Sequence, residues 1–368
     1  MSSKINLGIL FGGRSGEHEV SLMSARSVIS VLDKSKYNVV EIGITHQGEW
    51  VTGDNVSDAM SKNDTGHLPR IFILPEPNNA IVYRRAVDTN TISPLAKLDV
   101  VFPVLHGSYG EDGTLQGLLE MADLAYVGAG VLGSSIGMDK GLFKDVMKAQ
   151  GIPVVDWIVS SRTQVETNLN ALINSAEELS AYPLFVKPAN MGSSVGISKC
   201  KNRSDLMEGI LDAVRYDRRI LIEKGINARE IEVSVLGNDQ PIASVPGEVI
   251  PSDEFYSYKA KYIDGKSGLI IPAELSPEIT EKIRAIAIHT YTAIDCAGMA
   301  RVDFLLDKQT NEIFVNEVNT IPGFTSISMY PKLWEASGLS YARLIDRLIE
   351  LAIERKYDRD RIERQYGK

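Results

Sequence analysis

Apolar runs of strand length alternate with helical patterns in the first part of the chain. Residues 4–13 (KINLGILFGG) form an apolar run that ends at glycines. In residues 17–32 apolar side chains recur at helical spacing, at Val20, Met23, Val28 and Val31. A strand pattern returns at 98–107 (LDVVFPVLHG), and a helical pattern follows at 113–122. Strands that alternate with helices predict a mostly parallel α/β sheet here.

The same patterning divides the whole chain into three α/β units, residues 1–130, 131–222 and 223–368. The second unit holds helical patterns around the strand PLFVKP and a Gly/Ser-rich loop. The third is rich in strands at first, then carries a long helix, two strands and a C-terminal amphipathic helix. The polar, turn-rich stretch 53–70 is expected to be a surface excursion.

Two neighbouring strands of the third unit carry polar side chains at alternate positions. ARVDFLLD contains Arg301 and Asp303, and EIFVNEV with the next residue contains Glu317 and Asn319. The turn-like KQTN between the strands predicts an antiparallel hairpin. A loop of three or five residues would bring all four side chains to one face, and the sequence does not choose between them. Such oxygen ligands suit Mg²⁺; the alternative is a solvent-facing strand with ordinary ion pairs.

A glycine-rich loop follows the strand that ends at Lys187. VKPANMGSSVGISK allows backbone N–H groups to approach phosphate oxygens closely, with Lys187 as a point charge. This loop lacks the GxxxxGK[ST] order of a P-loop. The first segment, GILFGGRSGE, lacks the GxGxxG spacing of a dinucleotide-binding site. A plain turn is the alternative.

Two polar residues of the first unit are candidates for substrate binding. Glu17 lies near the start of the first predicted helix, where it either complements the helix dipole or binds a substrate ammonium group. His106 follows a strand at the end where α/β sheets bind ligands, although a lone histidine is more often structural.

Composition limits the class of protein. The 368 residues are 44% hydrophobic and 24% charged, as in a soluble globular protein. The net charge of −9 argues against nucleic-acid or anionic-membrane partners. Cys200 and Cys296 are far apart and suit buried thiols in a reducing compartment. No run reaches membrane-spanning length, so we expect a cytoplasmic protein.

Together these pieces resemble the D-alanine–D-alanine ligase family. The likeness runs in the family's order from GGRSGEHEVSL through HGSYGEDG, MDK, VKPANMGSSVGISK, LIEKGINAREIEV, YKAKYI and ARVDF to NEVNTIPGFTSISMYPKL. It implies an ATP-grasp fold of three α/β domains, with ATP held between the central and C-terminal domains. It also implies ligation of two D-alanines for peptidoglycan precursors, in the cytoplasm and as a homodimer.

The resemblance places ATP between the second and third units. Lys140 and Lys187 are expected to hold the phosphates, under a lid that carries Ser193 and Ser194. The lid residue Met191 departs from the polar residue, often glutamine, that is usual in close relatives. Because the backbone makes the phosphate contacts, we expect little effect.

The resemblance also assigns residues to the adenine and ribose of ATP and to the metal ions. Glu223 and the backbone around Lys224 and Ile226 are expected to face adenine, and Glu230 the ribose. The resemblance further implies two Mg²⁺ ions, for which Mn²⁺ can substitute. Their expected ligands are Asp303, Glu317 and Asn319, with Glu317 bridging.

Five residues are expected around the two amino acids. Glu17 pairs with the ammonium of the first D-alanine, and His106 lies near its carboxylate. Arg301 and the Gly323 N–H stabilise oxyanions, and Ser328 receives the carboxylate of the second D-alanine. The first carboxylate is activated as an acyl phosphate, which the second amine attacks.

A predicted closing loop carries Lys261 and Tyr262, with Tyr262 joining Ser193 and Glu17 in a hydrogen-bonded group. The loop tyrosine is absent from sister ligases that use D-lactate, so it favours an amine nucleophile here. D-serine as the second substrate is harder to exclude. A non-catalytic nucleotide-binding regulator would tolerate loss of Arg301 or the metal ligands, and all of them are present.

Overall fold

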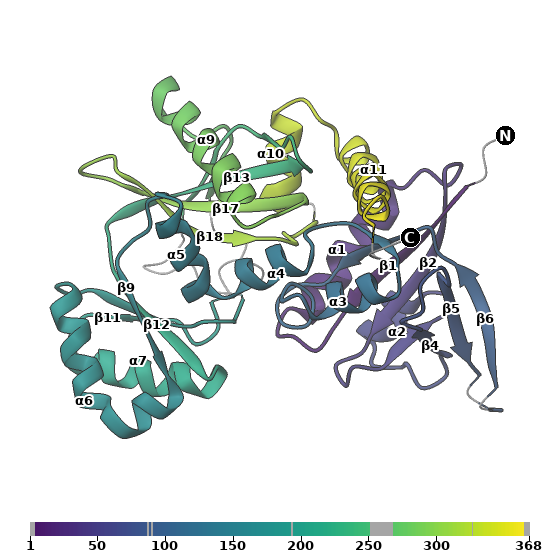
Figure 1. The fold of residues 1–368 in the computed structure, drawn as a ribbon, viewed down its shortest axis with the longest axis horizontal. Coiled ribbons are helices and arrows are strands. Elements are labelled where there is room, and N and C mark those ends of the chain that lie inside the picture. The colour runs from purple at the N-terminus through teal and green to yellow at the C-terminus, as the bar shows by residue number, and fades with distance from the viewer. Residues whose placement is uncertain are drawn as a thin grey trace.

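The computed structural model describes residues 4–86, 88–89, 91–192, 194–250, 268–325 and 327–363. These residues form three β-sheets with helices packed against them (Figure 1). Three sheets agree with the α/β architecture expected from the patterning. Within the described residues, no helix is both long and apolar enough to cross a membrane.

The first sheet has eight strands in the order β6-β5-β4-β3-β2-β1-β7-β8. The strands are β1 (Ile5–Gly12), β2 (Tyr37–Ile44), β3 (Trp50–Thr52), β4 (Arg70–Ile73), β5 (Ile81–Arg85), β6 (Ile92–Lys97), β7 (Val100–Val104) and β8 (Ala125–Tyr126). Strands β2, β1, β7 and β8 are parallel, but β3 to β6 are added antiparallel. The prediction of a mostly parallel sheet was therefore wrong for half of it. Only five residues join β2 to β3, and so short a link allows only an antiparallel pair.

Two details of the first unit also differ from the apolar pattern. In α1 (His18–Val31), Met23 is 44% exposed, whereas Ser21 and Ser24 are fully buried. The buried face thus includes serines that a count of apolar positions misses. The stretch 53–70 is not only a surface excursion, because it contains α2 (Val56–Ser61), which buries Val56 and Met60.

The second sheet is antiparallel, with strand order β11-β10-β12-β9. Its strands are β9 (Trp157–Ser161), β10 (Leu184–Pro188), β11 (Ser198–Cys200) and β12 (Arg219–Lys224). Helices α6 (Arg162–Leu179) and α7 (Arg203–Tyr216) close its core. A capping box at Ser161 and Gln164 starts α6, and Asn202 caps α7. Because β12 extends to Lys224, Glu223 lies in this sheet.

The third sheet has the strand order β16-β15-β13-β17-β18, and β14 pairs with β13. Its strands are β13 (Ala228–Gly237), β14 (Ile242–Ala243), β15 (Gly247–Ile250), β16 (Gly268–Ile270), β17 (Gly298–Asp307) and β18 (Ile313–Asn319). Helices α5 (Lys140–Ala149) and α9 (Pro277–Ala293) share a core with it. Helix α5 thus packs on the third sheet although it precedes the second in sequence.

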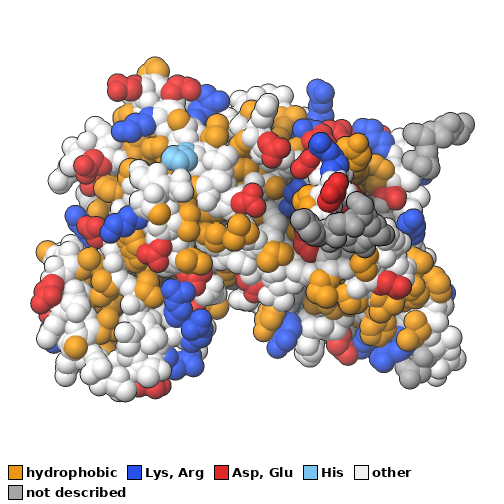
Figure 2. Space-filling view, in the orientation of Figure 1, with side chains coloured by type: hydrophobic (Ala, Val, Ile, Leu, Met, Phe, Trp, Pro, Cys, Tyr) orange, Lys and Arg blue, Asp and Glu red, His pale blue; other side chains and the backbone are white. Residues whose placement is uncertain are grey.

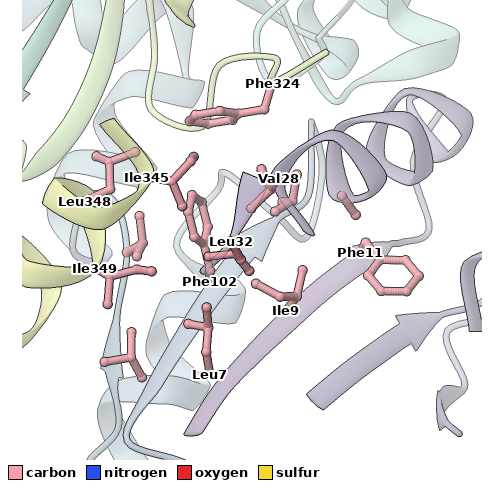
Figure 3. Close-up of a cluster of buried hydrophobic side chains, with 14 of the residues drawn as sticks. Leu7, Ile9, Phe11, Val28, Leu32, Phe102, Phe324, Ile345, Leu348 and Ile349 are labelled. Carbon is pink, nitrogen blue, oxygen red and sulfur yellow. The ribbon is translucent and has the colours of Figure 1, made fainter. Parts of the chain in front are cut away.

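Helix α3 (Thr114–Met121) packs on the first sheet. Helices α4 (Val131–Met138), α10 (Met329–Ala336) and α11 (Tyr341–Asp360) contact the third. The C-terminal helix α11 returns to the first sheet, where Ile345, Leu348 and Ile349 lie beside Leu7 and Phe102 (Figure 3). The same core extends to Phe324, whose ring meets that of Phe102 edge-on at 5.7 Å. One continuous core therefore spans both units.

Candidate functional site

The polar faces of β17 and β18 are aligned as the sequence predicted. Arg301 pairs with Asn319, and Asp303 with Glu317. The loop does not set this register, because Leu306 pairs with Ile313, which alone would put Asp303 opposite Asn316. A β-bulge beside Asp303 takes up Asn316 and moves Glu317 into place. Five residues, 308–312, separate the two strands, one of the two expected lengths, but the bulge and not the loop aligns the four side chains.

Arg301 is the centre of an ion cluster on this face. It is 7% exposed and donates two hydrogen bonds to the Asp303 carboxylate, at 2.7 and 2.6 Å. Its Nε also lies 2.9 Å from Glu232 Oε2 on the neighbouring strand β13. Asn319 Nδ2 donates to Asp303 Oδ2 at 3.0 Å. These contacts fix the positions of the Arg301 guanidinium and of the Asp303 carboxylate.

A second ion cluster joins β10, β12 and α5. Glu223 Oε2 lies 2.6 Å from Lys187 Nζ, and its Oε1 lies 3.1 Å from Lys144 Nζ. Burial raises the pKa of Glu223, but the two ammonium groups lower it more, to about 2. Burial in turn lowers the pKa of Lys144, which is fully buried. The Glu223 side chain is therefore engaged by two lysines.

A pocket of about 660 Å³ lies between the second and third sheets. That volume is within the usual range for small-molecule and cofactor sites, about 300–1,000 Å³. Its walls include most of the predicted nucleotide residues, namely Lys187, Ser194, Glu223, Lys224, Ile226 and Glu230, together with Asp303 and Glu317. Figure 2 shows Lys and Arg side chains along the edge of the second-sheet lobe that faces the rest of the molecule.

A smaller pocket of about 80 Å³ adjoins it where the first and third units meet. It is lined by the predicted residues Glu17, His106, Lys140, Arg301, Asn319 and Gly323. Ser194, Ile197 and Glu317 line both pockets, so the two meet at the bulged strand pair. Lys140 Nζ lies there as well, 3.9 Å from Glu317 Oε2 and 2.7 Å from the Met191 carbonyl oxygen to which it donates.

The comparisons with known proteins cover nearly all of the chain. A family model described as the D-ala D-ala ligase N-terminus matches residues 6–129, and one for the C-terminus matches residues 146–350. The D-alanine–D-alanine ligase of Chloroherpeton thalassium is 50% identical over 97% of this chain and 98% of its own. The chain belongs to the D-alanine–D-alanine ligase family.

Solved structures place the fold in the same family. The D-alanine–D-alanine ligase of Coxiella burnetii has a TM-score of 0.84 and 39% identity, over 98% of this chain and 97% of that one. The VanG D-Ala:D-Ser ligase of Enterococcus faecalis has a TM-score of 0.84 and 34% identity, over 95% and 100%. The three sheets are thus those of an ATP-grasp fold, as the resemblance implied.

His106 and its neighbours connect the first unit to the loop after β18. Because a carbonyl oxygen can only accept, the His106 Nδ1–H donates to Ile321 O at 2.9 Å, and Nε2 faces Ser24 Oγ at 3.2 Å. Burial lowers the pKa of His106, so the ring is neutral at pH 7. Ser24 Oγ also accepts from the Phe324 N–H at 3.3 Å. His106 therefore positions the loop that carries Gly323.

Glu111 is a partly buried residue of this pocket that the sequence reasoning did not single out. It accepts hydrogen bonds from Gly107 N at 2.7 Å and from Ile321 N at 2.9 Å. Burial, with the nearby Glu17 carboxylate, raises the pKa of Glu111 to about 8. The only signal in the sequence was its place in the loop HGSYGEDG.

Gly323 and Ser328 lie together at the start of α10. A Cβ at Gly323 would stand 2.8 Å from Ser328 Oγ, so a larger residue does not fit without a shift. Ser328 is the N-cap residue of α10, and its Oγ accepts from the Thr325 N–H at 3.0 Å. A helix N-terminus of this kind favours an anion such as a carboxylate.

Three predicted residues lie outside the described residues: Ser193, Lys261 and Tyr262. Their expected roles in the lid and the closing loop stay predictions. The same holds for the expected group of Glu17, Ser193 and Tyr262.

Proposed function

We propose that this chain joins two D-alanines to D-alanyl-D-alanine with ATP, as its relatives are named for doing. The observation that carries the proposal is the junction of the two pockets at Glu317 and Ser194. One pocket has the volume for a nucleotide and the other has groups for a small amino acid. Their meeting point brings a terminal phosphate and a carboxylate to the same strand face.

ATP occupies the larger pocket, with its phosphates toward the lysines. Lys187 and Lys140 supply positive charge, and the backbone around Ser194 approaches the phosphate oxygens. Because the Glu223 carboxylate binds two lysines, adenine is met by backbone groups. The N–H groups of Lys224 and Gly225 donate to Asp156 O and Pro183 O. Among the described residues the Ile226 N–H has no such partner, which supports its predicted role toward adenine; Glu230 takes the ribose.

Asp303, Glu317 and Asn319 fit Mg²⁺, with Mn²⁺ as a substitute. All three offer oxygen, and Asp303 and Glu317 stand directly opposite each other on paired strands. When bound, two such ions neutralise phosphate charge during transfer. Glu317 lines both pockets and would be the ligand that the two ions share.

The reaction needs an activated carboxylate. An oxygen of the first D-alanine carboxylate attacks the γ-phosphorus and the bond to ADP breaks, which gives D-alanyl phosphate. The deprotonated amine of the second D-alanine then attacks the acyl carbon, and inorganic phosphate leaves. Arg301 and the Gly323 N–H stabilise the oxyanion. Glu17 holds the first ammonium, and Ser328, at the α10 N-terminus, holds the second carboxylate.

D-Serine is the rival candidate for the second substrate. The D-Ala:D-Ser ligase of Enterococcus faecalis is as similar in fold as the D-alanine enzyme of Coxiella burnetii, so the fold does not separate the two. The argument against D-lactate rests on Tyr262, outside the described residues. Higher identity to D-alanine–D-alanine ligases, 50% against 34%, favours D-alanine. We further propose a homodimer in the cytoplasm, where precursors of the wall are made.

The test is ADP release with ATP and Mg²⁺, with products identified by mass spectrometry. The reactions contain D-alanine, L-alanine, D-serine, D-alanine plus D-serine, or D-alanine plus D-lactate. We expect D-alanyl-D-alanine from D-alanine alone and no product from L-alanine. Product formed only when D-serine or D-lactate is added would replace this proposal by the corresponding sister ligase.

A further inference from the structure

A group of metal-ligating side chains lies apart from both pockets. Within the part of the chain that the structure describes, one set of three His, Cys, Asp or Glu side chains has ligand atoms all within 4.8 Å of one another: His18, Glu19 and His46. His18 and Glu19 begin α1, and His46 lies in the turn between β2 and β3. None of the three lines either pocket.

His18 is already held as metal-binding histidines are. It is 2% exposed, and its Nδ1–H donates to the Gly13 carbonyl oxygen at 2.8 Å. In a neutral ring that bond leaves the lone pair on Nε2, and metal-bound histidines commonly use such a carbonyl bond to fix the ring. Burial lowers the pKa of His18, so protons compete little for Nε2 at neutral pH.

The other two side chains can move toward His18. His46 stacks on it with ring centroids 3.7 Å apart and planes inclined by 22°. His46 Nε2 lies 3.6 Å from Glu19 Oε1, and these side chains are 47% and 63% exposed. Ligand atoms about 2.0–2.2 Å from a tetrahedral ion stand roughly 3.3–3.6 Å apart. Lone pairs in stacked rings do not converge, so the exposed His46 ring has to turn out of the stack.

We propose that His18, Glu19 and His46 form a second metal site, for a divalent transition ion of the zinc type. Two imidazoles and one carboxylate suit Zn²⁺, whereas Mg²⁺ prefers oxygen ligands. The fourth position is open to water. The site also has a place in the enzyme's architecture, because His18 follows Glu17 directly. A bound ion therefore cross-links the start of α1, beside the substrate pocket, to the β2–β3 turn.

The test is Zn²⁺ binding by the full chain after metal removal with a chelator, measured by calorimetry in excess Mg²⁺ to occupy the oxygen-rich site. His46→Asn removes one of the three proposed ligands at a side chain that is half exposed. The matched control is His67→Asn, because His67 also contacts a carboxylate, Asp64 at 3.6 Å, but belongs to no such group. Both variants should keep wild-type ligase activity with Mg²⁺, which shows that they fold.

We expect one Zn²⁺ per chain that wild type and His67→Asn bind equally and that His46→Asn binds at least ~100-fold more weakly, since even the loss of a supporting contact costs 10–100-fold. The ring protons of His46 should lose the ring-current shift that stacking causes when Zn²⁺ is added. Equal Zn²⁺ binding by wild type and His46→Asn, or no binding by either, would overturn the proposal.

Discussion

The two pockets of this chain are bounded by different kinds of contact. The first and third sheets share one apolar core, in which Leu7 and Phe102 of the first unit pack with Phe324 and Leu348. The second sheet and its helices α6 and α7 form a separate lobe (Figure 1) with a core of their own. Ion pairs join this lobe to α5 and to Asp139. The amino-acid pocket therefore sits between units held by continuous packing, and the nucleotide pocket beside a unit held by ion pairs.

Two ion pairs join the second-sheet lobe to α5 and its N-cap residue Asp139. Lys144 on α5 meets Glu223 on β12, and Arg219 on β12 meets Asp139 at 2.5 Å. A shared apolar core resists relative movement because any shift opens cavities, whereas ion pairs can re-form after a shift. A ligase that must exclude water from an acyl phosphate but also admit ATP benefits from this division.

The largest effect is expected at the residue common to both pockets. Glu317→Gln keeps the size of the side chain and removes its charge, so the metal ions lose a ligand. Turnover should fall below detection, and the dependence on Mg²⁺ should disappear from nucleotide binding. Activity assays and nucleotide titrations over a Mg²⁺ series measure these two effects. An unchanged Mg²⁺ dependence would remove Glu317 from the ligand set.

Arg301→Ala should act mainly on the amino-acid pocket. Loss of an oxyanion donor typically costs ~10²–10³ in turnover. Binding of ATP should fall much less than turnover, because Arg301 lines the smaller pocket and touches the larger one only through Asp303. Steady-state rates and nucleotide titration separate the two effects. Near-normal turnover would exclude Arg301 from the mechanism.

Lys144→Met should affect the nucleotide pocket and not the amino-acid pocket. Breaking a fully buried ion pair costs about 3–5 kcal/mol of folding free energy, since Glu223 loses one of its two cations. We expect lower stability of the second unit and a raised KM for ATP, with the KM for D-alanine unchanged. Denaturation and kinetics measure these, and Lys148→Met, on the same helix, is the control. An equal rise in both KM values would mean that the units are not independent.

Glu111 makes stability depend on pH at the first–third interface. Its carboxyl pKa is about 8 in the folded chain, because burial disfavours the charge. The unfolded chain releases that proton near pH 4.5, so this stabilising contribution is complete below that pH and is lost as pH rises toward 8. Denaturant unfolding from pH 5 to 9 should show a decline in wild type that Glu111→Gln lacks. Parallel curves for the two proteins would contradict the raised pKa.

The smallest effect is expected at Ser24. Ser24→Ala removes the contacts to His106 and to the Phe324 N–H, worth about 1 kcal/mol. Turnover should fall a few-fold, because the loop that carries Gly323 loses one support while the apolar core remains. Ser30→Ala, an exposed change on the same helix, is the control. A loss as large as that of Arg301→Ala would show that packing alone does not hold this interface.

Sequence reasoning reached the parts of the site that follow from local periodicity. Alternation along two strands placed Arg301 and Asp303 on one face, and the partner strand supplied Glu317 and Asn319. It missed the bulge at Asn316, because a one-residue insertion leaves no compositional sign. It also missed Lys144 and Ser24, whose partners lie far away in sequence. For the fold it foresaw three α/β units but not the antiparallel half of the first sheet.

The most direct test of the account uses D-alanine labelled with ¹⁸O in its carboxylate. If the carboxylate meets the γ-phosphate where the two pockets join, each ligation transfers one labelled oxygen to inorganic phosphate, which mass spectrometry detects. Label in AMP, with pyrophosphate released, would mean that the carboxylate attacks the α-phosphate and would contradict the account.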